Sequence, residues 1–445
     1  MRKQDTLFIG LMLFALFFGA GNLIYPPYLG MEAGTSYWKA ISGFVITGVG
    51  LPILAVAAVA LVKNGAQEMG NRVHPVFGLY FTALVYLSIG PFFGIPRGAA
   101  VAFEMGVRPF TAASSWNDSV TLAVFSLLFF ALVYWVSLNP SKIVDTVGQW
   151  LTPALLLAIL ALCIASFVQF NAPLQAPAAK YEASPFFTGF VEGYLTMDTI
   201  AALAFGIIVI TAFQERGVKN QKQMLRYTLK AGLIAGSGLA FVYVALGWMG
   251  AKMASAGSFE NGTAILTTAT EQLFGQSGKL LLGTIVALAC FTTCVGLTTA
   301  CGQYFTKLFP KASYKFIVSV ITLGSFLIAN LGLNQIISIS VPVLVFVYPL
   351  AIVLIVLSFF HRYLSRSRAV YAGAMLMTGL VSLYDGLKTA GLKSAQLQVL
   401  ADSLPFASFG LGWIVPALIG GLLGFSFAKL QKNSFSSISK EEKAS

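Results

Sequence analysis

The chain has 445 residues, of which 57% are hydrophobic and 10% are charged, and its formal net charge is +12. A soluble globular protein carries roughly 25% charged residues, so this composition excludes a soluble enzyme, a disordered scaffold and a nucleic-acid-binding protein. The apolar residues form long blocks, which is typical of a polytopic membrane protein.

The apolar blocks run through almost the whole chain. A membrane-spanning helix needs about 20 mostly apolar residues, and twelve segments meet this requirement. An even number of spans places both termini on the same side of the membrane. In chain order the predicted helices cover 6–30, 40–62, 75–105, 119–138, 147–170, 185–213, 226–252, 277–306, 314–331, 335–360, 368–387 and 405–429.

The basic residues are distributed unevenly over the predicted loops. With the N-terminus in the cytoplasm, 20 of the 28 Lys and Arg lie in cytoplasmic segments, seven lie in outer segments and Arg97 lies within a helix. Cytoplasmic loops of membrane proteins carry an excess of Lys and Arg, so the pattern predicts cytoplasmic termini. The excess of basic residues in cytoplasmic loops then accounts for the net positive charge. The predicted partner of the protein is the lipid bilayer, and neither nucleic acid nor an obligatory protein partner is predicted.

Two of the twelve segments are interrupted by residues that weaken helices. The first contains Gly19-Ala20-Gly21-Asn22 followed by Pro26-Pro27, and the sixth contains a polar stretch over 192–199. Glycine weakens a helix and proline removes a backbone donor. Unwound backbone at membrane depth occurs only where it lines a cavity or is buried in protein. We therefore expect the chain to unwind at both places.

The spacing of the two interruptions points to a transporter. Helices 1 and 6 are five crossings apart, so they have opposite orientations in the membrane. Broken helices at corresponding positions of two such halves are typical of secondary transporters built from inverted repeats. Two ordinary kinked helices are the alternative, because Gly and Pro are common in membrane spans.

Few ionisable groups lie within the predicted spans, and such groups are candidates for function. Asp198 lies in the interruption of helix 6, where a role in binding is predicted. Arg97 and Glu104 lie seven residues apart on one face of helix 3, and we expect an ion pair between them. No phosphate-binding loop is present, and both histidines fall at cytoplasmic helix ends. ATP hydrolysis and a histidine proton relay within the membrane are therefore not predicted.

The interruption of helix 1 can bind both an anion and a cation. Free N–H groups at the start of a half-helix attract a carboxylate, and free carbonyls at the end of the other half suit a hard cation. In helix 8, Thr298 and Thr299 present adjacent hydroxyls, and Val295 offers a carbonyl one turn earlier. Membrane threonines also bond to their own helix backbone, so both interpretations of this pair stay open.

Two long stretches carry a resemblance to a known family. DTLFIGLMLFALFFGAGNLIYPPYLG in helix 1 and GYLTMDTIAALAFG in helix 6 resemble the branched-chain amino acid:cation symporters of bacteria, the BrnQ family. The resemblance implies an all-α membrane protein with the LeuT-type fold and broken helices 1 and 6. It implies repeats over 1–170 (helices 1–5) and 185–361 (helices 6–10), then helices 11 and 12 over 366–430. Residues 431–445 are predicted to form a cytoplasmic tail, and the content of Ser, Lys and Glu from 433 to 445 predicts that this end is disordered.

The resemblance also implies an activity. Members import leucine, isoleucine and valine with Na⁺, in some cases Li⁺, through alternating access and without an organic cofactor. This places the chain in the bacterial inner membrane and indicates that it is not an enzyme. A proton-coupled transporter of another amine or of a nucleobase is the closest alternative. A channel, which would not accumulate its substrate, is the alternative of another class.

Site residues follow from two motifs that LeuT-type transporters share. Gly19-Ala20-Gly21-Asn22 with Pro27 is similar to their helix 1 pattern, and Gly296-Leu297-Thr298-Thr299 is similar to their helix 8 pattern. The implied sodium ligands are carbonyls of Ala15, Phe18 and Val295 with hydroxyls of Thr298 and Thr299. The implied substrate site comprises two groups of residues: Gly19, Ala20, Gly21 and Asn22 in helix 1, and Leu195, Thr196, Met197 and Asp198 in helix 6. The N–H groups of Ala20 and Gly21 are expected to bind the substrate carboxylate. The helix 6 residues are expected to lie near the substrate amine.

The resemblance is incomplete at the outer gate. LeuT has an arginine before the helix 1 proline, and this sequence has Tyr25 in the matching area. Arg97 is a candidate to replace that arginine. Phe18 and Phe205 are candidates for the wall of the aliphatic pocket.

Overall fold

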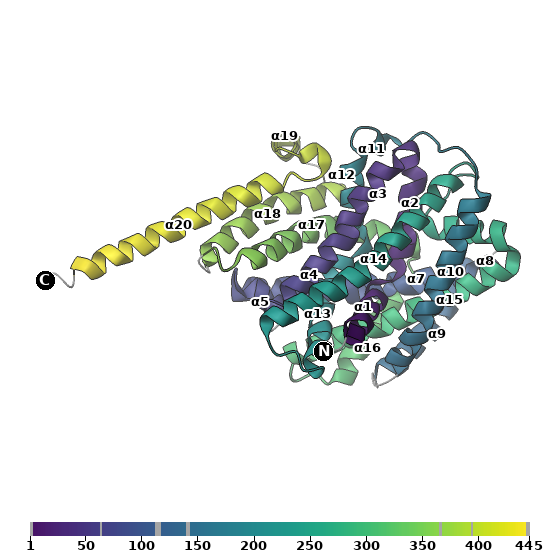
Figure 1. Cartoon of the computed structure of the whole chain (residues 1–445), viewed down its shortest axis with the longest axis horizontal. Coiled ribbons are helices and arrows are strands. Elements are labelled where there is room, and N and C mark those ends of the chain that lie inside the picture. The colour runs from purple at the N-terminus through teal and green to yellow at the C-terminus, as the bar shows by residue number, and fades with distance from the viewer. Residues whose placement is uncertain are drawn as a thin grey trace. The chain divides into compact units, whose positions relative to one another are not determined.

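The computed structural model describes residues 3–62, 65–111, 117–138, 143–364, 367–392 and 395–441, and within these ranges it contains helices and no strand (Figure 1). Helices satisfy their own backbone hydrogen bonds, which an apolar environment requires. Each of the twelve predicted segments contains helix. Residue 366, the first of the predicted segment 366–430, and residues 442–445, the end of the predicted tail, lie outside the described residues.

The chain divides into two compact units. The first comprises Met1–Val56 and Val85–Ser340, and the second comprises Ala57–Leu84 and Val341–Ser445. The interrupted helices 1 and 6 belong to the first unit. The predicted division into inverted repeats at 170 and 361 stays a prediction.

The first unit is built mainly from long apolar helices joined by short helical pieces. In chain order its elements are α1 (Lys3–Phe17), α2 (Ala20–Ala33), α3 (Tyr37–Val45), η2 (Ile46–Gly50), η3 (Ser88–Phe92), α7 (Gly94–Gly106), α8 (Arg108–Thr111), α9 (Asp118–Ser137), α10 (Ile143–Gln169), α11 (Ala179–Glu182), α12 (Pro185–Glu192), η4 (Gly193–Thr196), α13 (Asp198–Glu215), α14 (Gln221–Met253), α15 (Gly262–Leu308) and α16 (Tyr314–Ala329).

The second unit contains fewer helices. It holds α5 (Ala66–Asn71), α18 (Arg368–Thr389), α19 (Ala395–Asp402) and α20 (Ile414–Glu441), while α4 (Leu51–Val59), α6 (Pro75–Leu87) and α17 (Leu333–Phe360) run from one unit into the other. Helices α18 and α20 cross backbone to backbone, because a side chain at Gly373 or Gly420 would run into the carbonyl oxygen of the other residue. Small residues at such crossings let membrane helices approach closely.

In the part of the chain that the structure describes, eight helices are long and apolar enough to cross a membrane, and four shorter helices are also apolar. Large apolar side chains on them point outward; on α9, Leu128 is 62% and Trp135 is 66% exposed. A soluble protein would bury most of that surface, whereas lipid covers it in a bilayer. The chain is therefore a multi-pass membrane protein.

Both predicted interruptions are present. Helix 1 is divided into α1 and α2 around Gly19, whose backbone is extended at φ −136° and ψ −163°. Helix 6 is divided into α12 and α13 by the short turn η4 and by Met197, which has a left-handed φ of 69°. Pro26 and Pro27 lie inside α2 without ending it. The glycines and the polar stretch were therefore the informative signals.

Helix 3 contains a further interruption that was not predicted. The turn η3 separates α6 from α7, and within it Gly90 leaves the helical region with φ −88° and ψ −122° next to Pro91. Gly90-Pro91 is a recognisable breaker pair. The break matters because it sets the direction of α7, the helix that carries Arg97.

Two helix boundaries and the tail differ from expectation. Helix α15 begins at Gly262 instead of 277, because Asn261 caps it by accepting from the N–H groups of Thr263 and Ala264; it then kinks at Gly275. Helix α20 begins at Ile414 and continues to Glu441. The expectation of disorder from 433 onward is thus wrong as far as 441, because this stretch contains no Gly or Pro to stop the helix.

Close contacts with α14 and α15 fix the position of α2. A side chain at Gly30 would run into the carbonyl oxygen of Gly247, one at Gly250 into that of Pro27, and one at Gly262 into that of Ile24. These backbones touch without side chains between them, as in close membrane helix pairs. The start of α2, at the interruption, is therefore held firmly in the first unit.

Candidate substrate and cation site

The two interrupted helices meet at a cavity inside the first unit. The cavity has a volume of about 40 Å³, and its wall is formed by the end of α1, the start of α2, α7, the helix 6 interruption, α13 and α15. Seven of the eight predicted substrate residues line it: Gly19, Ala20, Gly21, Asn22, Thr196, Met197 and Asp198. Leu195 does not line the cavity, but its carbonyl accepts a hydrogen bond from Arg97, which does.

Asn22 joins the two interruptions. Its Oδ1 accepts from the N–H of Gly19 at 2.8 Å, and its Nδ2 donates to Asp198 Oδ2 at 2.9 Å. Asn22 is 1% and Asp198 is 3% exposed. A buried amide can satisfy both a donor and an acceptor, so one side chain ties the start of α2 to the start of α13.

Asp198 also bonds to a residue that the sequence did not single out. The hydroxyl of Tyr243, on α14, donates to Asp198 Oδ2 at 2.6 Å, and it also contacts Asn22 Nδ2. Asp198 is the first residue of α13, where the helix dipole favours negative charge. The carboxylate is thus held by two donors and a helix end. Tyr243 lay within an apolar run, where nothing distinguished it from a packing residue.

Arg97 is buried in the wall of the same cavity. It is 4% exposed, and it donates through Nη1 to Leu195 O at 2.8 Å and through Nη2 to Thr196 O at 3.0 Å. The Tyr25 hydroxyl lies 3.4 Å from Nη1. A single side chain from α7 therefore reaches both the helix 6 interruption and α2.

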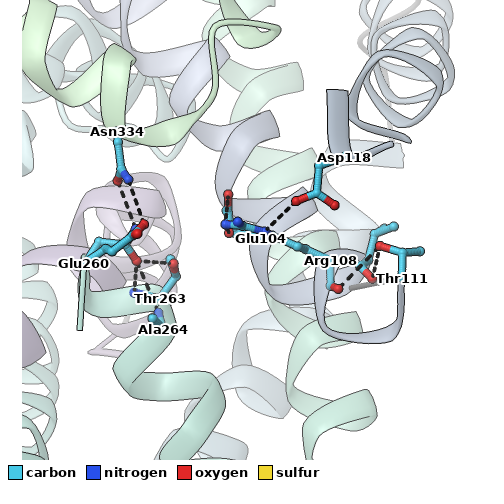
Figure 2. A network of polar contacts seen from close by, with 10 residues as sticks. Glu104, Arg108, Thr111, Asp118, Glu260, Thr263, Ala264 and Asn334 are labelled. Carbon is cyan, nitrogen blue, oxygen red and sulfur yellow. Dashed lines mark hydrogen bonds and ion pairs between the residues drawn. The ribbon is translucent and has the colours of Figure 1, made fainter. Parts of the chain in front are cut away.

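The expected pair between Arg97 and Glu104 is wrong. Glu104 accepts from Arg108 Nη1 at 2.8 and 3.1 Å, and Arg108 Nε also lies 3.5 Å from Asp118 (Figure 2). Glu104 and Arg108 are four residues apart, which places them closer on a helical surface than residues two turns apart. Arg97 points toward the cavity, and none of the ion pairs found in the described part of the chain includes it.

A threonine other than the predicted pair approaches α1. Thr293 Oγ1, on α15, lies 3.5 Å from Phe18 O and donates to Ala289 O at 3.0 Å, and Thr293 also lines the cavity. The adjacent Thr292 hydroxyl bonds to the same Ala289 carbonyl at 2.9 Å. Hydroxyl and carbonyl oxygens are therefore gathered next to the unwound end of α1.

Thr298 and Thr299 point elsewhere. They lie five and six residues beyond Thr293, so their side chains are rotated from it by roughly 140° and 120° in opposite senses around the helix. Thr298 shares a face with Cys294, whose thiol bonds to Ile95 O of α7. The hydroxyls of Thr298 and Thr299 are buried and make no hydrogen bond within the described ranges, although the Tyr314 side chain lies close to Thr299. Neither residue lines the cavity.

The three residues whose carbonyls were predicted as sodium ligands differ in burial. Phe18 is buried and its carbonyl faces Thr293, Val295 is buried within α15, and Ala15 is half-buried in α1. Phe205 lines the cavity, whereas Phe18 stacks on Phe14 instead.

A cluster of charged residues connects the segment before helix 6 to α2, the second half of helix 1, and to α12, the first half of helix 6. Lys180 Nζ lies 2.5 Å from Glu32 Oε2 at the end of α2 and 2.6 Å from Glu192 Oε1 at the end of α12. The Tyr181 hydroxyl donates to Glu192 Oε2 at 2.6 Å. Burial lowers the pKa of Lys180, but the charges and hydrogen bonds of Glu192 and Glu32 outweigh it, so the net shift is upward. The ammonium consequently stays charged throughout the neutral range.

We expect Lys180→Met to make stability depend on pH. The stabilisation by Lys180 is fully present below its ordinary pKa, so in the unmodified protein it does not change between pH 5 and 8. Without Lys180 the two carboxylates repel, so the free energy of unfolding should be about 1 kcal/mol lower at pH 8 than at pH 5, a small difference because the lysine is partly exposed. Thermal unfolding at the two pH values measures it. Lys388→Met, which breaks an exposed pair with Asp402, is the control. Equal pH profiles for both variants would contradict the expectation.

Comparison with known proteins decides the family. Residues 2–431 match the model of the family described as branched-chain amino acid transport protein. The chain belongs to this family. It is 46% identical over 424 residues to the branched-chain amino acid permease BraB of Bacillus subtilis, covering 95% of each chain. It is 47% identical over 422 residues to the permease BrnQ of the same species, covering 94% of this chain and 95% of that one.

A relative from another bacterium agrees with this family assignment, and two solved structures share the fold. The chain is 46% identical over 424 residues to the branched-chain amino acid transport system 2 carrier protein of Pseudomonas aeruginosa, covering 95% and 96%. Mhp1, a nucleobase-cation-symport-1 family transporter with bromovinylhydantoin bound, superposes with a TM-score of 0.63 at 13% identity, covering 96% and 93%. MhsT in complex with L-phenylalanine gives 0.58 at 16%, covering 95% and 98%. The predicted LeuT-type fold is confirmed, and the family relatives are named permeases and carriers, not enzymes.

Proposed function

We propose that this protein imports branched-chain amino acids by symport with sodium, through alternating access, in the inner membrane of a bacterium and with both termini in the cytoplasm. The names of the relatives support the substrate class. The observation that carries the proposal is the convergence of both interrupted helices on one cavity, with a buried arginine and a buried aspartate in its wall. A zwitterion with an aliphatic side chain has the matching chemistry.

In this proposal each part of the amino acid has its own partners. The carboxylate binds at the start of α2, where the N–H groups of Ala20 and Gly21 have no partner within their helix. The ammonium lies near the helix 6 interruption between Leu195 and Asp198. The aliphatic side chain packs against apolar residues of the wall, which include Leu16, Ile89, Phe205 and Leu297.

Sodium, the coupling ion, is proposed to bind beside the unwound end of α1. The sequence motif favours Ala15, Phe18 and Val295 carbonyls with Thr298 and Thr299. The contact between Thr293 and Phe18 favours a site one and a half turns earlier on α15, formed by Ala289, Thr292 and Thr293. A hard cation binds hydroxyl and carbonyl oxygens of this kind, and Li⁺ uses the same ligands.

Alanine variants distinguish the two sets of ligands. Thr293→Ala should raise the sodium concentration for half-maximal leucine uptake several-fold, because it removes an oxygen that faces Phe18 O, while Thr298→Ala and Thr299→Ala should leave it near the unmodified value. The measurement is leucine uptake into proteoliposomes over a sodium series, with protein insertion checked for each variant. The reverse pattern would restore the Thr298–Thr299 site, and no change in any variant would remove both.

The same proteoliposomes test the coupling itself. Leucine uptake is measured with a gradient of sodium, of lithium or of protons supplied separately. Accumulation above the outside concentration with sodium supports the proposal. Accumulation with protons alone would favour the proton-coupled alternative, and equilibration without accumulation under every gradient would indicate a channel.

A further inference from the structure

Two positive groups lie side by side in the cavity wall. Arg97 Nη2 would be 2.7 Å from a Cβ placed on Gly21, so the guanidinium lies directly against the first turn of α2. Helix α2 has 14 residues, and the N-terminal end of a helix carries a partial positive charge. Two like charges at this distance in a buried site destabilise each other unless an anion lies between or beside them.

The guanidinium is also incompletely satisfied. Its two Nη atoms bond to Leu195 O and Thr196 O, whereas Nε is buried and has no hydrogen-bond partner among the residues described. The side chain is 4% exposed and lines the cavity. A buried charged donor without a partner is costly, and no carboxylate of the described chain pairs with it. Asp198 lies in the same cavity wall but makes no ion pair with Arg97, so an anion that enters the cavity can bind this free donor.

We propose that Arg97 binds the α-carboxylate of the amino acid together with the start of α2, and so determines that the substrate must carry this carboxylate. The inference rests on the proposed function, and it adds a charged receptor to backbone N–H groups that alone would bind a carboxylate weakly. Arginine is suited to the role because its planar fork binds carboxylates in a fixed geometry.

The position of Arg97 also gives the carboxylate a structural effect. The guanidinium is anchored on the carbonyls of the helix 6 interruption and lies 3.4 Å from the Tyr25 hydroxyl of α2. A carboxylate bound to Arg97 therefore adds its own contacts to a side chain that already connects α7, α2 and the helix 6 interruption. An analogue without the carboxylate lacks these contacts and leaves the guanidinium without an anionic partner.

The test compares leucine with leucinol, which lacks the carboxylate but keeps the amine and side chain. Binding of both is measured on the purified full-length protein, for the unmodified chain and for Arg97→Gln and Arg97→Lys. We expect Arg97→Gln to weaken leucine binding by about ten- to a hundredfold, as for loss of a charged hydrogen-bond partner, and leucinol binding by less than about threefold. The preference for leucine over leucinol should therefore collapse.

A merely structural role for Arg97 gives a different pattern. Leucine and leucinol would then weaken equally, the preference would be unchanged, and the proposal would be overturned. If Arg97→Gln does not fold, Arg97→Lys decides, because a retained charge with altered geometry should still weaken leucine more than leucinol. Arg108→Gln, which removes a guanidinium paired with Glu104 outside the cavity, should keep the full preference. An unmodified protein that binds no leucine would refute the proposed function instead.

Discussion

Gly21→Val is expected to abolish leucine binding. A Cβ at this position would lie 2.7 Å from Arg97 Nη2 and 2.8 Å from Thr196 O, and real Cβ atoms do not approach heavy atoms so closely. The backbone at Thr196 cannot easily move away, because Met197 beside it holds a left-handed conformation and Arg97 bonds to the Thr196 carbonyl. The larger side chain would therefore displace the guanidinium and cover the N–H groups that are proposed to receive the carboxylate.

The measurement is leucine binding to purified Gly21→Val protein, with thermal unfolding as a check of folding. Gly324→Val is a matched control, because a Cβ on Gly324 in α16 meets nothing closer than Pro91 Cβ at 3.9 Å. It should bind leucine normally. A folded Gly21→Val protein with unchanged leucine affinity would show that neither Arg97 nor the start of α2 contacts the substrate.

The interruptions of helices 1 and 6 could be predicted because their signals are local. Glycines at 19 and 21 and a polar stretch in a membrane span weaken a helix wherever it packs. Gly90-Pro91 is an equally local signal in helix 3, and it produces a break that was not predicted. The surrounding segment is apolar and long enough to span the membrane without a break, so its hydropathy alone gives no sign of this interruption.

The partners of Arg97 and the threonines of α15 depend on tertiary structure. Spacing shows which residues share a helical face, so Arg97 with Glu104 was a permissible pair, but Arg108 one turn further offered Glu104 a closer partner. Beyond its kink at Gly275, helix α15 contains two pairs of adjacent threonines, 292–293 and 298–299. Only the rotation of the helix against its neighbours decides which pair faces α1, and packing against α1, α7 and α16 sets that rotation.

Asp198→Asn is also expected to have a large effect on leucine binding. The structure shows that this variant removes the charge of the side chain while it can keep the hydrogen bonds. Asp198 Oδ2 accepts from Asn22 Nδ2 at 2.9 Å and from the Tyr243 hydroxyl at 2.6 Å. An asparagine in its place keeps an oxygen for both donors, so the link between the interruptions survives while the charge is lost. We favour the hypothesis that this charge contacts the substrate ammonium or the coupling ion, over the alternative that the carboxylate only fixes the interruption.

Under the favoured hypothesis, Asp198→Asn lowers leucine affinity about five- to a hundredfold, the effect of losing a charge contact of roughly 1–3 kcal/mol. Its thermal stability should hold or rise, since a buried carboxylate without a bound cation is costly. Tyr243→Phe should show the opposite balance, with lower stability from the lost donor and a smaller change in affinity, because the charge remains. Binding and unfolding measurements on both variants separate the roles. Normal leucine and sodium affinities in folded Asp198→Asn protein would show that the charge is not used, and Asp198 would then act by holding the start of α13 against Asn22 and Tyr243.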